Sequence, residues 1–194
     1  MMVADASVWI NLVATGGADW ILKAIPCPVA ITDVAFDELD RGRLKGRQAA
    51  DEVTGLVRIG LAQVVRLDPA DEALFLSLVR GTASETLDDG EAATLACANR
   101  LGACAVIDER KATSLAARRL AHLEVRTTTD LLLRPSVRDV FGEAVLAQAV
   151  FAALTGARMR VPERHAEQIV SLLGRERAAL CHSLSARFRA VQSG

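Results

Sequence analysis

Short apolar runs alternate with helix-type stretches through the first 135 residues, and this alternation limits the possible folds more than any other feature of the chain. The apolar runs cover residues 2–4, 29–32, 63–67, 103–107 and 123–127. The stretches with helical spacing or propensity cover residues 12–25, 35–59, 70–79, 90–101 and 109–121. Because strands that alternate with helices form βαβ units, the pattern predicts an α/β fold with a central parallel sheet of about five strands, covered on both faces.

The length predicts one domain, or one domain with an appendage, and the composition is that of a globular protein. The chain has 194 residues, of which 51% are hydrophobic and 4% aromatic with no tyrosine, so the core must be built from Ala, Val, Leu and Ile. After Pro135 the sequence is almost wholly helical in character. We therefore predict a domain over residues 1–135 and a helical C-terminal extension over residues 136–194, which packs on the body or on a partner. The expected breaks in this extension are at Gly156, Pro162 and Gly174.

The charge and the cysteines narrow the functional classes. A net charge of -1 gives no general attraction for a polyanion, so any nucleic-acid contact must be local. No apolar run approaches the roughly 18 residues that a membrane span needs, so no membrane role is predicted. The four cysteines form no Cys-x-x-Cys pair, and no signal peptide is recognisable. These features predict reduced thiols and a cytoplasmic location.

Four carboxylates stand where an apolar run ends or where the following helix begins, namely those of Asp5, Glu38, Glu91 and Asp108. In an open parallel sheet such points converge on the crevice outside the carboxyl ends of the strands. Two bare carboxylates about 4 Å apart repel by roughly 4 kcal/mol at an effective dielectric of 20, so a cluster of four calls for a cation. Oxygen ligands favour Mg²⁺ or Mn²⁺. Zinc sites are usually built from histidines and cysteines. The three histidines of this chain are scattered over its later part.

Three of these acids also have a purely structural interpretation. Asp5 and Asp108 each precede a helix, where aspartate is a favoured N-cap. Glu91 lies three residues after Asp88, which is the spacing of a capping box. Glu91 nevertheless shares a helix side with apolar residues, and a carboxylate on a buried side needs a partner or a metal.

Glu38 competes with two neighbouring acids on the same helix. Asp37 and Asp40 have the character of solvent-exposed surface acids. Glu38 lies one helical turn after Val34, which makes it the best candidate of the three to face the carboxyl edge of the sheet.

The four acids sit in sequence blocks that resemble, in the same order, the acidic motifs of PIN-domain nucleases. The blocks are residues 2–8 with Leu12, residues 31–39 with Gly42, residues 89–96 and residues 106–112. The third block, with Gly-Glu-Ala, and the fourth, with Asp-Glu-Arg-Lys-Ala, most resemble the bacterial and archaeal branch that includes VapC-like toxins of type II toxin–antitoxin systems. The resemblance covers roughly residues 2–135.

The resemblance implies a PIN-like α/β/α sandwich and a metal-dependent ribonuclease that hydrolyses phosphodiester bonds. It also implies that one set of acids is both catalytic and metal-binding, with Mg²⁺ or Mn²⁺ as the cofactor. This set is Asp5, Glu38, Glu91 and Asp108. The residues implied to support the ligands or to contact the substrate are Ser7, Thr128 and Asp130.

The partners implied by the resemblance are an RNA substrate, an antitoxin protein and a second copy of the chain. An antitoxin would lay an apolar helix or strand in a groove and place a basic side chain in the acidic pocket. Four arginines are candidates to contact backbone phosphates. Each can also be explained as an ordinary surface residue that keeps the protein soluble. These are Arg41, Arg43, Arg47 and Arg110.

Three other classes of protein compete with the nuclease. A receiver domain has a pair of acids after its first strand, and a phosphotransferase of the haloacid-dehalogenase type has Asp-x-Asp there. This chain has Asp5-Ala6-Ser7 at that position, which matches neither pattern. The serious alternative is a catalytically weak or inactive PIN-like scaffold that acts as a binding or regulatory module. The presence of all four acids favours the nuclease over this scaffold.

Overall fold

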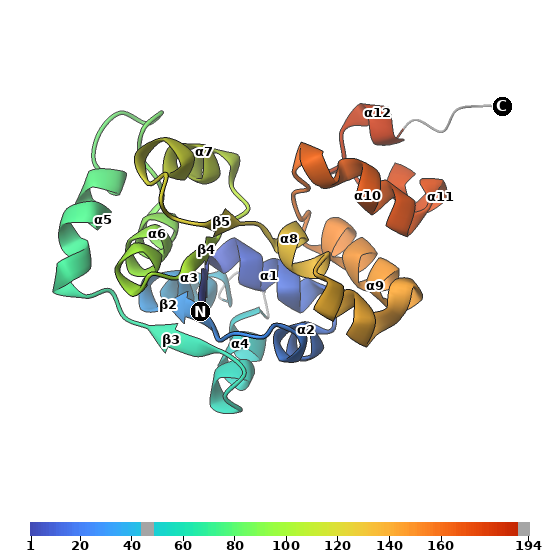
Figure 1. Ribbon diagram of the computed structural model, residues 1–194, viewed down its shortest axis with the longest axis horizontal. Helices are drawn as coiled ribbons and strands as arrows, with labels where there is room; N and C mark the ends of the chain where they lie inside the picture. Colours follow the sequence, from blue (N-terminus) through green and yellow to red (C-terminus); the bar gives the residue numbers. More distant parts are fainter. Residues whose placement is uncertain (44–48, 190–194) are drawn as a thin grey trace. The chain divides into compact units, whose positions relative to one another are not determined.

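The computed structural model of the protein describes residues 1–43 and 49–189 and contains a five-stranded sheet (Figure 1). The strands are β1 (Met2–Ala4), β2 (Val29–Thr32), β3 (Gln63–Val65), β4 (Cys104–Val106) and β5 (Val125–Arg126). They pair in parallel in the order β3-β2-β1-β4-β5. The predicted α/β class is therefore confirmed, with a central parallel sheet flanked by helices.

The first strand lies in the middle of the sheet. Val3 of β1 is in register with Ala30 of β2 on one side and with Ala105 of β4 on the other. All three side chains are fully buried, as expected for parallel strands that are covered on both faces. This central place puts the carboxyl end of β1 between those of β2 and β4.

Contacts between residues divide the described chain into two units. The first holds residues 1–9 and 26–126, and the second holds residues 10–25 and 127–189. The helices of the first unit are α3 (Asp33–Arg43), α4 (Ala49–Arg58), α5 (Glu72–Val79), α6 (Asp89–Leu101) and α7 (Arg110–Arg119), with a short 3-10 turn at Pro69–Asp71. The predicted domain boundary at residue 135 stays a prediction.

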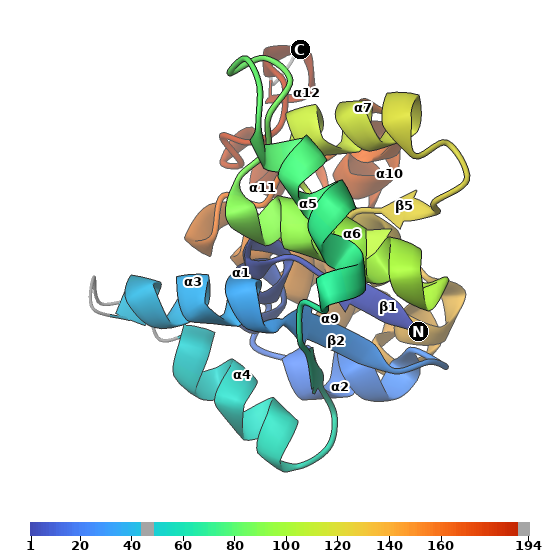
Figure 2. The same cartoon turned by 90° about the vertical axis from the view of Figure 1, so that its left-hand side faces the viewer.

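Helix α6 is the best-covered helix of the first unit. It packs against β1, β2 and β4 and against the neighbouring helices α3 and α5 (Figure 2). Its Leu95 is fully buried in a cluster with Val3, Ile107 and Leu115 of β1, the β4 end and α7. Figure 2 also shows β2 running directly into α3, so the start of α3 is fixed by the end of a central strand.

Several predicted boundaries were wrong. The stretch over residues 35–59 is not one helix, because α3 and α4 pack against each other, and residues 44–48 lie outside the described part. The strands predicted over residues 63–67 and 123–127 are shorter. After β3 the Leu67 amide donates to Asp33 Oδ1, at 3.1 Å, which takes that amide out of the sheet.

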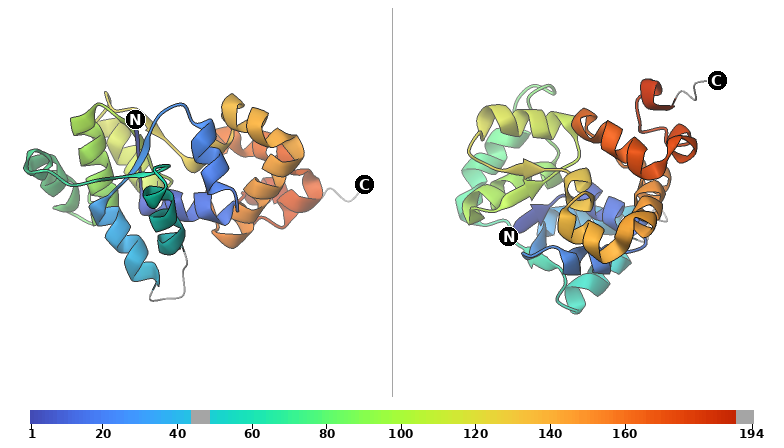
Figure 3. Two further views of the ribbon diagram at one scale, coloured as in Figure 1. Left: turned by 90° about the horizontal axis from the view of Figure 1, so that it is seen from below. Right: turned by 45° about the vertical axis from the view of Figure 1, so that its right-hand side comes forward.

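The second unit is helical. It contains the end of α1 (Ala6–Ala14), and α2 (Ala18–Ala24), α8 (Thr128–Leu132), α9 (Pro135–Gly156), α10 (Glu163–Leu173), α11 (Arg175–Ala179) and α12 (Ala186–Arg189), as Figure 3 shows. The predicted breaks at Gly156, Pro162 and Gly174 are confirmed. No helix in the described residues is long and apolar enough to cross a membrane.

Two glycines break helices where the sequence analysis predicted none. Residues 12–25 form two helices because Gly16 has a φ of 70°, in the left-handed region that glycine tolerates. The Thr15 hydroxyl then accepts a hydrogen bond from the Gly17 amide, at 3.1 Å. Gly142 has a φ of 69° and kinks α9 in the same way.

Candidate metal centre

Asp5 follows β1 directly and is held in place from two sides. Its amide donates to the Val106 carbonyl on β4, at 3.0 Å, which ties it to the neighbouring strand. Its Oδ2 accepts hydrogen bonds from the Ser7 hydroxyl, at 2.8 Å, and from the Ser7 amide, at 3.2 Å. Asp5 is only 5% exposed, and its Oδ1 is buried with no hydrogen-bond partner in the described residues. A buried acceptor of this kind normally has a partner, so Oδ1 needs an explanation.

Glu38 and Asp5 approach each other over Gly90. Glu38 belongs to α3, which begins where β2 ends, and Gly90 belongs to the first turn of α6. A methyl group built on Gly90 would lie 2.7 Å from Glu38 Oε2 and 3.3 Å from Asp5 Oδ1. The two carboxylate oxygens therefore face the same small space beside the start of α6.

Glu91 takes part in capping the N-terminus of its own helix, α6. Its Oε2 accepts a hydrogen bond from the Asp88 amide, at 3.3 Å, and the Asp88 side chain caps the helix in return. This is the capping box that the spacing indicated. Glu91 is 9% exposed, and burial, together with the charge of Asp5, raises the pKa of Glu91 to about 7.

The charges of nearby acids raise the pKa of both Asp5 and Glu91. Burial raises the pKa of Asp5 above its ordinary value, against the hydrogen bonds from Ser7, and the charge of Asp88 raises it further. The hydrogen bond from the Asp88 amide lowers the pKa of Glu91, whereas the charges of Glu109 and Asp88 raise it. The charge of Asp88 thus acts on both of these acids.

Asp108 lies two residues after the end of β4, the strand that pairs with β1. It is 5% exposed. The structure therefore places it at the same edge of the sheet as Asp5, on the adjoining strand. That Asp5, Glu38, Glu91 and Asp108 act together as ligands stays a prediction.

The donors at this edge suit a hard divalent cation. The unpartnered Asp5 Oδ1 and the Glu38 carboxylate supply anionic oxygens, which Mg²⁺ and Mn²⁺ prefer. In residues 1–43 and 49–189 no three acid, histidine or cysteine side chains are grouped closely enough to enclose an ion. Mg²⁺ does not require such an enclosure, because it is usually bound through one or two carboxylates with water and substrate phosphates.

The pKa of Glu91 predicts an unusual pH dependence of stability. In the metal-free protein, folded Glu91 keeps its proton up to about pH 7, whereas the unfolded chain loses it near 4.5. The folded state therefore binds more protons between these values, and the free energy of unfolding should fall as the pH rises through this window. Urea denaturation of wild type and Glu91→Gln at several pH values measures the effect.

Glu91→Gln should weaken this dependence, and glutamine can still complete a capping box. The matched control is Glu72→Gln, which replaces an exposed acid in the first turn of α5 and should follow wild type. An equal slope for wild type and Glu91→Gln would contradict the prediction.

Asp130 has a full set of partners within the second unit. Its Oδ2 accepts hydrogen bonds from the amide and hydroxyl of Thr127, the N-cap of α8, and pairs with Arg164 at 2.6 Å. His165 Nε2 lies 2.7 Å from its Oδ1. Burial would raise the pKa of Asp130, but the hydrogen bonds from Thr127 and His165 and the charge of Arg164 outweigh it and lower the pKa. Asp130 therefore joins α8 to α10.

Thr128, the other hydroxyl residue implied after the last strand, is fully buried in α8. The parts that Thr128 and Asp130 play towards a substrate stay predictions, as does that of Ser7. Sequence reasoning missed the partners of Asp130, since His165 is 35 residues away and only folding brings it close.

Two of the candidate phosphate contacts are described. Arg41 is exposed on α3, one turn after Glu38, and Arg110 is exposed at the start of α7, two residues after Asp108. Arg47 and the side chain of Arg43 lie outside the described residues. Two exposed cations thus follow closely after two of the acids.

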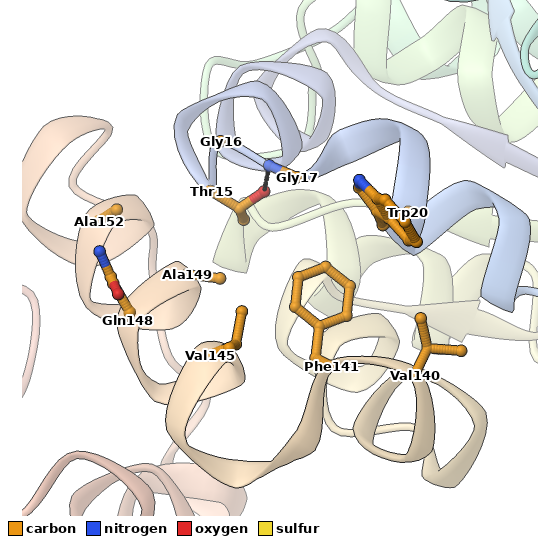
Figure 4. Close-up of a pocket in the computed structure, with 10 residues that line it drawn as sticks. All are labelled: Thr15, Gly16, Gly17, Trp20, Val140, Phe141, Val145, Gln148, Ala149 and Ala152. Carbon is orange, nitrogen blue, oxygen red and sulfur yellow. Dashed lines mark hydrogen bonds between the residues drawn. The ribbon is translucent and has the colours of Figure 1, made fainter.

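A pocket of about 540 Å³ lies within the second unit, between the segment at Thr15–Trp20 and helix α9 (Figure 4). Phe141 and Val145 point towards this segment, and Trp20 is 58% exposed. The described lining contains no acid, histidine or cysteine, so it offers no side chain that titrates near neutral pH.

The comparison with protein families agrees with the fold and with the predicted PIN-domain family. A family model described as "DUF3368: PIN domain" matches residues 1–175. The chain therefore belongs to the PIN-domain family, and PIN domains are generally nucleases that use divalent metals. No curated protein and no solved structure matches the chain.

Proposed function

We propose that this PIN-domain protein is a metal-dependent ribonuclease. The observation that carries the proposal is the buried, unpartnered Oδ1 of Asp5, which shares one small space with Glu38 Oε2 over Gly90. A buried anionic oxygen without a partner is costly, and a divalent cation would satisfy it. The resemblance of the four acidic blocks to PIN-domain nucleases supports the same site.

The residues at the carboxyl edge of the sheet would share the work. Asp5 and Glu38 would bind the cation directly. Asp108 and Glu91 would lie around it. The hydrogen bonds from Ser7 to Asp5 Oδ2 hold the carboxylate so that Oδ1 stays directed at the site. Arg41 and Arg110 would receive backbone phosphates. When bound, Mg²⁺ or Mn²⁺ would polarise the phosphate and make the attacking water more acidic.

The reaction is hydrolysis. The water oxygen forms a bond to phosphorus, the bond from phosphorus to O3′ breaks, and the proton of the water ends on the leaving O3′. The products therefore carry a 5′-phosphate and a 3′-hydroxyl. Attack by the neighbouring 2′-hydroxyl of RNA would instead leave a 2′,3′-cyclic phosphate.

The test uses labelled RNA and single-stranded DNA of the same sequence, incubated with the full chain and Mn²⁺, Mg²⁺ or a chelator. We expect metal-dependent cleavage of RNA that leaves 5′-phosphate ends and stops in the chelator. Cleavage with 2′,3′-cyclic ends, or unaffected by the chelator, would exclude the proposed chemistry. No cleavage with either metal would favour the PIN-like scaffold that binds without cutting.

We also propose that this ribonuclease is the toxin of a toxin–antitoxin pair, on the resemblance of the third and fourth blocks to VapC-like toxins. An antitoxin protein and a second copy of the chain would then be its protein partners. Induced expression in bacteria should arrest growth for wild type and not for Asp5→Asn. Equal growth of both strains at equal protein levels would oppose the toxin role while leaving the ribonuclease proposal open to the cleavage test.

A further inference from the structure

Gly90 occupies a helix position where alanine and most other residues would favour the helix more. It is buried in the first turn of α6, with an ordinary helical backbone that an alanine would adopt without strain. Glycine is a poor helix former because it loses more backbone freedom on folding than alanine does. The backbone of α6 therefore gives no reason for a glycine here, and the reason must lie in what surrounds its Cα.

The three atoms nearest to a Cβ built on Gly90 are two carboxylate oxygens and one backbone carbon. A Cβ at Gly90 would lie 3.8 Å from the Cα of Ala35, which is ordinary van der Waals contact. It would lie 2.7 Å from Glu38 Oε2, which is too close for the two atoms to remain in place, and 3.3 Å from Asp5 Oδ1. Because Glu38 Oε2 is the far end of a flexible side chain on an exposed residue, Glu38 would swing away and the helices would stay where they are.

The space that the missing side chain leaves open also adjoins a buried carboxylate oxygen that lacks a hydrogen-bond partner. Asp5 Oδ1 is buried, has no hydrogen-bond partner in the described residues and lies beside the Gly90 Cα. The Ser7 bonds occupy the other oxygen and fix the carboxylate, so Asp5 cannot follow Glu38 outward. A side chain at residue 90 would therefore separate the two carboxylates.

We propose that Gly90 is a positioning residue that keeps the space between Asp5 and Glu38 open, so that both carboxylates reach one divalent cation. The proposal rests on the metal-dependent function proposed above. It assigns to Gly90 a role in ion affinity and none in the stability of the metal-free fold.

Gly90→Ala in the full chain tests this role through Mn²⁺ binding, measured by electron paramagnetic resonance of the free ion and without reference to activity. We expect the Mn²⁺ affinity to fall by about 10- to 100-fold, the range seen when a group that orients a metal ligand is lost. The melting temperature of the metal-free variant should equal or exceed that of wild type, because alanine favours the helix.

Gly55→Ala is the matched control. Gly55 lies inside α4, and a Cβ there would meet no atom within 4 Å. This variant should gain helix stability like Gly90→Ala and keep the Mn²⁺ affinity of wild type. Gly90→Ala combined with Glu38→Asp should recover part of the lost affinity, since the shorter carboxylate leaves room for the methyl group.

The outcomes separate the role of Gly90 from the proposed function. If wild type and Gly90→Ala bind Mn²⁺ equally, the role of Gly90 is wrong and the metal-dependent function stands. If Gly90→Ala melts well below wild type, the glycine is required for packing, and the positioning role is again wrong. If wild type itself binds no Mn²⁺, both proposals fall together.

Discussion

Asp5→Asn is expected to lower Mn²⁺-dependent cleavage of RNA by more than about 100-fold, because losing a group that only orients a metal ligand already costs about 10- to 100-fold. The substitution removes the anionic charge beside Gly90 and keeps an oxygen that can accept the Ser7 hydrogen bonds. It also replaces a buried carboxyl group whose pKa is raised, chiefly by burial. The metal-free variant should therefore melt at or above the temperature of wild type while its cleavage rate collapses.

Ser7→Ala provides a graded companion to Asp5→Asn. It keeps the carboxylate and deletes the hydroxyl bond to Oδ2, so we expect a smaller loss of about 10- to 100-fold. Asp139→Asn, an exposed acid of α9, should cleave like wild type. Cleavage by Asp5→Asn at a rate near that of wild type would remove Asp5 from the proposed site.

Glu38→Gln should also abolish most of the Mn²⁺-dependent cleavage, with a loss of about 100-fold, because the neutral amide cannot replace an anionic ligand of a hard cation. Its neighbour Asp37 gives the sharpest control available in the chain. Both residues are exposed on α3, and Asp37→Asn makes the same kind of change one position away. Single-turnover cleavage of labelled RNA measures both variants.

Asp37→Asn should keep the rate of wild type within a factor of about two, since a surface substitution away from the site has little effect. The pair thus tests whether the orientation of the side chain matters or only the charge of the helix. Equal losses in both variants would indicate a general electrostatic effect of α3 and would argue against Glu38 as a specific ligand.

The sheet and the convergence of Asp5 with Glu38 were predictable because they follow from the chain order of buried strands. The run around Val3 has a partner in each of the runs around Ala30 and Ala105, so its carboxyl end had to lie between theirs. The choice of Glu38 over Asp37 followed from helical periodicity alone, and the structure directs Glu38 Oε2 at the space over Gly90.

Other features depend on contacts that no local pattern encodes. Gly90 could have been noticed as a helix glycine without a turn to explain it, but the carboxylate beside it comes from a helix more than 40 residues earlier. The left-handed backbone of Gly142 divides α9 at an isolated glycine whose neighbours give no turn signal. The sequence around Asp130 does not indicate its partners, because Arg164 and His165 come close to it only through tertiary packing.

The central place of β1 has a consequence for synthesis of the protein. β1 is made before either of its neighbours, and one of them, β4, begins only at Cys104, so β1 keeps an open edge until about 100 further residues have been translated. Such long-range parallel pairing is slow to form and leaves unpaired edges exposed in the meantime. The edge of the sheet that carries Asp5 and Asp108 is therefore completed only after Asp108 has been synthesised.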